Sequence, residues 1–139
     1  MGTWDSGPFD NDTAADWCGD LDDADVAQRP ALVRGALSRA AGEDGYPDAD
    51  IACEAIAAAA IVAAQLPGGQ PITSPYAPDF LRDGGRLDLP DDLAVLAVRA
   101  LDRVMAADCE WRDLWQDDAA ADVNPAFDTV RSLRRVLTA

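Results

Sequence analysis

The sequence predicts an all-α protein, a compact bundle of about six helices around a central alanine-rich helix. Ala is the strongest helix former and supplies 28 of the 139 residues, whereas the β-branched and aromatic residues that favour strands are scarce. Apolar residues recur every three or four positions, the spacing that places them on one face of a helix. The chain is about one domain long, so we expect residues 1–139 to form a single helical domain with an irregular loop over residues 67–89.

The first predicted helix ends near Asp23 and has an apolar side and an acidic side. Asp10 or Asn11 is placed to cap its first turn, and Phe9 precedes the cap as an apolar staple. At about 100° per residue, one side carries Ala14, Trp17, Cys18 and Leu21. The opposite side carries Asp12, Asp16, Asp20 and Asp23.

The second predicted helix opens at Arg29-Pro30 and stops at Gly42, a residue typical of helix C-termini. Its inward face is expected to hold Leu32, Val33, Ala36, Leu37 and Ala40.

The third predicted helix, residues 51–66, is apolar around its whole circumference, so we expect it at the centre. Asp48 or Asp50 is placed to cap it. Glu54 is the one charged residue inside this helix. If it is buried, its carboxylate must pair with an arginine or have a raised pKa, and if it is exposed it has no such consequence.

Three further helices are expected after the Pro- and Gly-rich loop. Pro90 suits the first position of a helix that reaches about residue 107, and a short helix follows over residues 109–116. The last helix begins at Asn124-Pro125 and turns inward Phe127, Val130, Leu133 and Leu137. The aromatic anchors of this alanine-rich core are expected to be Phe9 and the four tryptophans Trp4, Trp17, Trp111 and Trp115.

The composition excludes several functions. With no His, Ser-His-Asp catalysis and imidazole metal ligands are absent, and with no Lys, Schiff bases and P-loop lysines are absent. A net charge of −15 disfavours binding to nucleic acid phosphates. No segment is long and apolar enough for a membrane span, and three dispersed cysteines suit reduced thiols in the cytoplasm. We expect no cofactor.

The charge is placed unevenly, because residues 1–28 hold eight Asp and no Arg, whereas residues 123–139 hold three Arg and one Asp. One interpretation is structural: the acidic face docks near the basic C-terminal helix, and Asp12 and Asp16 pair with arginines. The other is a binding surface for a basic protein, made of Asp10, Asp12, Asp16, Asp20 and Asp23. Asp12 and Asp16 are also the candidate ligands for a divalent metal, although the EF-hand pattern fails at Ala14.

The opening M-G-T-W-D-S-G-P-F-D-N-D-T-A-A-D-W (residues 1–17) resembles the start of a bacterial family known as domain of unknown function 4259, whose members begin M-G-x-W-G-x-G-P-F-x-N-D-x-A-x-D. Similar stretches recur at the third helix, at Arg99 to Val104 and at residues 110–115. The chain departs from the family at Asp5, Cys18 and Cys109-Glu110-Trp111. The resemblance implies a compact helical bacterial domain and carries over no activity or catalytic residue.

The sequence therefore favours a non-catalytic, acidic protein-binding module of the inhibitor, immunity or adaptor type. The most specific version of this hypothesis is an inhibitor whose acidic surface mimics DNA. A carboxylate enzyme that uses a divalent metal is one alternative. A small structural protein that oligomerises through its alanine-rich helix is another. The oligomeric state stays open.

Overall fold

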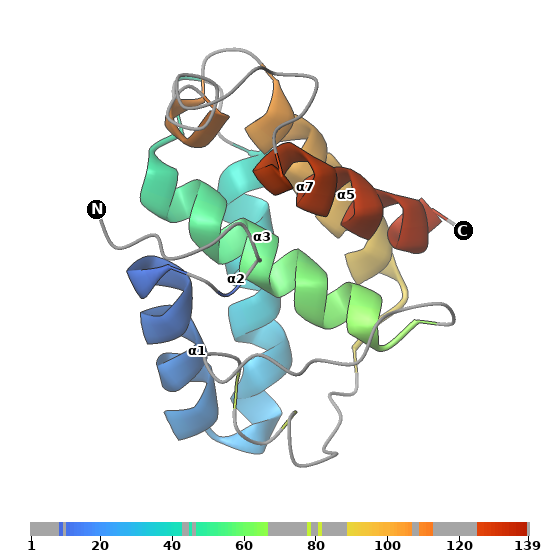
Figure 1. Cartoon of the computed structure of the whole chain (residues 1–139). Helices are drawn as coiled ribbons and strands as arrows, with labels where there is room; N and C mark the ends of the chain where they lie inside the picture. Colours follow the sequence, from blue (N-terminus) through green and yellow to red (C-terminus); the bar gives the residue numbers. More distant parts are fainter. Residues whose placement is uncertain are drawn as a thin grey trace.

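The computed structural model describes residues 9, 11–42, 45, 47–66, 78, 81, 89–106, 109–112 and 125–138. All the elements in these ranges are helices, which confirms the all-α prediction (Figure 1). They are α1 (Asp12–Asp23), the 3-10 helix η1 (Val26–Gln28), α2 (Arg29–Ala41), α3 (Ala49–Ala64), α5 (Asp92–Met105) and α7 (Pro125–Thr138).

Helix α3 is the central element, as its composition predicts. It contacts α1, α2, α5 and α7, and it passes between α1 and α7 in Figure 1. All its residues from Ala55 to Ala63 are buried. Because most of these side chains are single methyl groups, neighbouring helices can approach α3 closely and bury it on every side. Within the described ranges no helix is long and apolar enough to cross a membrane.

Local capping decides where α1 and α3 begin. The side-chain oxygen of Asn11 accepts a hydrogen bond from the Ala14 amide at 2.8 Å, and Asp48 accepts one from the Ile51 amide at 2.9 Å. The structure thus selects Asn11 for α1 and Asp48 for α3. Asp10 lies outside the described residues. Because Asp48 is the cap, α3 begins two residues before the predicted start and ends two residues before the predicted end.

Two predictions for α2 and α5 are wrong in detail. Leu32 was expected inward but is 37% exposed, because it lies about 90° around α2 from the centre of the stripe formed by the buried Val33, Ala36, Leu37 and Ala40. Helix α5 begins at Asp92, not at Pro90, and it ends at Met105. The Pro90 carbonyl instead accepts a hydrogen bond from the Leu93 amide at 3.1 Å. Pro90 therefore lies in a turn that precedes the helix.

The C-terminal helix packs through aromatic and aliphatic anchors. Phe127 is buried, and its ring centroid lies 5.6 Å from that of the buried Trp111. Val130 and Leu137 are also buried, whereas Leu133 is half-buried. Helix α7 thereby covers α5 and α3. Trp4, Trp115, most of the loop and the second half of the predicted 109–116 helix lie outside the described residues.

A contact that the sequence did not suggest joins the start of α3 to residues 109–112. The Glu110 carboxylate accepts a hydrogen bond from the Ala49 amide at 2.8 Å, and the Glu110 amide donates to the Pro47 carbonyl at 3.0 Å. A carboxylate at a helix N-terminus satisfies a free N–H group and interacts favourably with the helix dipole. Glu110 therefore acts as a second cap of α3, across a separation of 61 residues.

Candidate functional site

The candidate site is the acidic face of α1, which we define as Asp12, Asp16, Asp20 and Asp23. All four side chains are exposed. Their orientation follows from the other side of the helix, where Ala14, Trp17, Cys18 and Leu21 are buried in the core. Because these apolar side chains fix the rotation of α1, its aspartates must point to solvent. Asp10, the remaining predicted binding residue, lies outside the described part of the chain.

Contacts at both ends hold α1 in place. Near its start, the Thr13 hydroxyl donates to Asp50 of α3 at 2.8 Å. At its end, the Arg29 guanidinium donates from Nε to the Leu21 carbonyl at 3.0 Å and from Nη2 to the Asp22 carbonyl at 2.8 Å. A cation at a helix C-terminus satisfies the last carbonyls and complements the dipole. Sequence reasoning missed this role of Arg29, although an arginine soon after a helix end is a usable signal.

No charge compensates the acidic face from within the described residues. No hydrogen bond or ion pair formed there reaches the carboxylates of Asp12, Asp16, Asp20 or Asp23. The expected arginine partners of Asp12 and Asp16 are therefore not found in this part of the molecule. Four ion pairs join described arginines to Asp92, Glu54, Asp128 and Asp102, all of which lie outside the acidic face.

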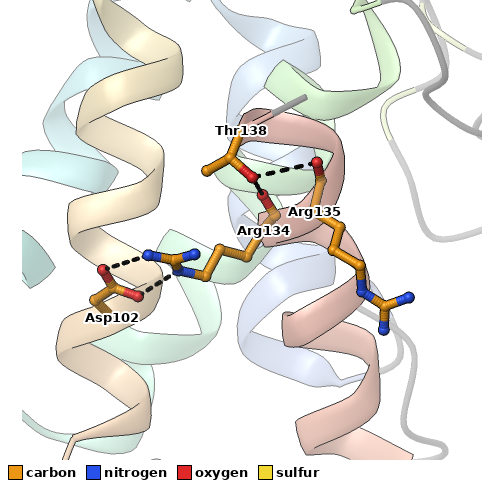
Figure 2. A network of polar contacts seen from close by, with 4 residues as sticks. All are labelled: Asp102, Arg134, Arg135 and Thr138. Carbon is orange, nitrogen blue, oxygen red and sulfur yellow. Dashed lines mark hydrogen bonds and ion pairs between the residues drawn. The ribbon is translucent and has the colours of Figure 1, made fainter.

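The expected docking of the acidic face beside the basic C-terminal helix is also not seen. Helix α1 contacts α3, whereas α7 contacts α5 and the α3 side that Figure 1 places away from α1. Arg131 pairs with Asp128 in its own helix, and Arg134 pairs with Asp102 of α5. In Figure 2 the side chain of Arg135 points away from Asp102. The aliphatic residues of α7 decide its position, and they dock it on α5.

The negative potential extends from α1 to the start of α3. Partial burial raises the pKa of Glu54, and the carboxylates of Asp50, Asp20 and Asp48 raise it further. The Arg39 guanidinium, 2.7 Å from the Glu54 carboxylate, opposes this shift. Glu54 thus shows both consequences expected of a partly buried carboxylate, since it has an arginine partner and a raised pKa.

The described residues form no site with an evident chemistry of its own. They contain no group of three or more carboxylate or thiol side chains placed to hold a metal ion, so Asp12 and Asp16 have no third ligand among them. The three cysteines are unpaired. Burial raises the pKa of the Cys18 and Cys53 thiols to about 12, so both stay protonated near neutral pH and are poor nucleophiles.

Comparison with known proteins gives one match. Residues 2–124 match the family described as a domain of unknown function (DUF4259), a range that includes α1, α2, α3 and α5. No curated protein and no solved structure matches the chain. Because the family match covers most of the sequence, the protein belongs to the DUF4259 family.

Proposed function

We propose that this protein is a non-catalytic binding module that holds a basic partner protein on the acidic face of α1. The observation that carries the proposal is the exposure of four aspartates on one helix with no cation partner among the described residues. We place this role in the cytoplasm, a location that three unpaired cysteines support.

The arrangement is unfavourable for the isolated helix, which supports a role in binding. Asp12, Asp16 and Asp20 follow one another at four-residue spacing, and like charges so placed destabilise a helix by about 0.2–0.5 kcal/mol per pair. A partner that supplies Arg or Lys side chains converts this repulsion into attraction. The negative potential also speeds encounter with a basic surface.

The position of α1 suits a docking surface. The helix is anchored by its apolar side, by Thr13 and by Arg29, so none of its four exposed aspartates is needed to hold it. A rigid element that presents side chains without using them for folding loses little entropy when a partner binds.

The test is a capture experiment with matched charge variants. One variant carries Asp12→Asn, Asp16→Asn and Asp20→Asn. The control carries Asp92→Asn, Asp102→Asn and Asp128→Asn, which changes the net charge by the same amount elsewhere on the surface. Each purified protein is immobilised and exposed to bacterial lysate at low salt, and the bound proteins are eluted with high salt and identified by mass spectrometry.

We expect wild type and the control triple variant to retain the same basic protein, and the α1 triple variant to lose it. Binding should weaken steeply between low and physiological salt, because exposed charges are screened over about 10 Å at 0.1 M. Equal recovery with both triple variants would contradict the proposal, since it would show that only net charge matters.

A further inference from the structure

An exposed surface without charged side chains lies at the corner between α1 and α2. It consists of η1 and the outward side of the first turns of α2, and we call it the uncharged corner: Val26, Ala27, Gln28, Ala31 and Leu32. All five are exposed, with Val26 at 71% and Leu32 at 37%. Gly35 continues the same side; it is half-buried, and a β-carbon added to it would meet nothing within 4 Å.

Both arginines within residues 26–35 are engaged by other elements. Arg29 donates to carbonyls at the end of α1, as described above. Arg34 donates from both terminal nitrogens to the Asp92 carboxylate of α5, each at 3.0 Å. These hydrogen bonds direct the two guanidinium groups toward α1 and α5.

The corner has the form of a helix-docking surface. Gln28, Ala31, Leu32 and Gly35 recur at spacings of three and four, so they share one side of α2. Ala31 and Gly35 are small and permit close approach of another backbone. Val26 and Leu32 supply the larger apolar side chains that a partner would bury.

The charges beside the corner indicate what fits it. Asp25 precedes Val26 directly, Asp23 and Asp20 lie on the last turn of α1, and all three are exposed. A second copy of this chain would bring its own aspartates against them, at a net charge of −15 on each molecule. A basic segment is instead attracted by the same aspartates, because its charge is opposite to theirs.

We propose that the uncharged corner and the aspartates beside it bind an amphipathic helix of the partner protein, with its apolar side against Val26, Ala31 and Leu32 and its Arg or Lys residues against Asp20, Asp23 and Asp25. This inference rests on the proposed function and specifies the class of partner. The corner provides selectivity for an apolar stripe, and the acidic face provides charge attraction.

Two synthetic peptides of about five helical turns test the inference. One carries Leu along one side and Arg along the other, and in the second every Leu is replaced by Gln, which keeps helix propensity and charge. Fluorescence anisotropy gives Kd for wild type, for Val26→Ser with Leu32→Ser, and for the control Val95→Ser. Val95 is 64% exposed on α5, so its variant removes an equally exposed valine elsewhere. Circular dichroism checks that each variant is folded.

We expect wild type and Val95→Ser to bind the Leu peptide about tenfold more tightly than the Gln peptide, the ratio expected from burying one or two apolar side chains. The double variant should bind both peptides equally. Equal binding by wild type, or a preference that survives in the double variant, would overturn the inference. So would a concentration-dependent dimer in light scattering that the double variant abolishes, because the occupant would then be a second copy.

The Gln peptide separates the two proposals. If wild type binds it and the α1 triple variant does not, the acidic face works by charge, whatever the Leu peptide shows. If wild type binds neither peptide, both proposals are wrong.

Discussion

On α5 and α7 three exposed aspartates each meet an arginine, whereas on α1 the aspartates of the acidic face meet none within the described residues. Arg34 reaches Asp92 at 3.0 Å, Arg134 reaches Asp102 at 2.7 Å, and Arg131 reaches Asp128 at 3.2 Å. The pairs with Asp92 and Asp102 connect α2 with α5 and α5 with α7, as Figure 2 shows for the second. The same residue type is thus paired with arginine on α5 and α7, whereas the four aspartates of the acidic face have no arginine partner among the described residues.

The difference teaches that aspartate abundance alone does not define the acidic face. Composition spreads aspartates over the whole chain, and packing decides which of them find a cation. The position of α1 depends on Trp17, Leu21 and the two polar anchors at its ends, so it does not depend on the exposed aspartates. Substitutions in the two regions can test whether apolar packing, and not charge, positions these helices.

Phe127→Ala tests whether α7 is held by apolar contact or by its ion pairs. Phe127 is almost fully buried against Trp111, so we expect the free energy of unfolding to fall by about 3–5 kcal/mol. The comparison variant Arg134→Ala removes the exposed ion pair with Asp102 of α5, and it should change little. Urea denaturation measures both. A small loss for Phe127→Ala would mean that charge pairs position α7.

Gly19→Ala tests whether α1 can be stabilised without touching its charges. Gly19 is exposed within the helix, and a methyl group there would meet nothing within 4 Å. We expect a gain of about 0.5–1 kcal/mol in the free energy of unfolding, because Ala reduces the entropy of the unfolded chain. Gly42→Ala is the control, since its added methyl group would lie 3.1 Å from the Ser38 carbonyl oxygen. An equal gain in the free energy of unfolding for Gly42→Ala would show that the space around the added methyl group does not decide the effect.

Glu54→Gln tests a carboxylate that has features of both regions, because it pairs with Arg39 and also lies near the carboxylates of Asp20 and Asp50. Burial and neighbouring carboxylates raise the pKa of Glu54 above its ordinary value of 4.5. As pH rises, the unfolded chain therefore loses this proton before the folded protein does. The stabilisation from protonated Glu54 is complete below pH 4.5 and is lost as pH passes the raised folded value.

The Gln variant does not titrate at this position. Wild type should consequently lose free energy of unfolding relative to Glu54→Gln as pH is raised from about 3 to 7, which thermal melts at several pH values will show. A difference that stays constant with pH would show that Arg39 cancels the effect of burial, and a change in the opposite direction would show that Arg39 outweighs it.

The smallest changes in the free energy of unfolding are expected when one aspartate is neutralised on the acidic face and one in an ion pair of α5. Asp16→Asn relieves repulsion from Asp12 and Asp20, so the free energy of unfolding should rise by about 0.2–0.5 kcal/mol per relieved pair. Asp102→Asn removes the partner of Arg134 and should lower the stability slightly, because exposed ion pairs contribute little. The opposite signs are the informative result. Differential scanning calorimetry at low and high salt should show both effects shrinking with salt.

Much of the helical framework was predictable because its signals are local. A cap needs only a side-chain oxygen near the first free amides, as Asn11 and Asp48 show, and Gly42 marks the end of α2. The alanine-rich composition of α3 predicted its central place, since a helix without a polar side must be surrounded. The errors in the helices were also local: a shift of two residues in α3, the start of α5 at Asp92 and not at Pro90, and the outward position of Leu32.

The sequence by itself determined the helix class, the two candidate caps at the start of α1 and of α3, and the clustering of aspartates on one side of α1. Helical periodicity and short-range hydrogen bonds depend on residues a few positions apart. Only the tertiary structure decided which acids have partners. Glu110 caps α3 from 61 residues away, and Arg34 finds Asp92 from 58 residues away. These contacts depend on how apolar surfaces pack, and packing places most of the described arginine partners away from the acidic face.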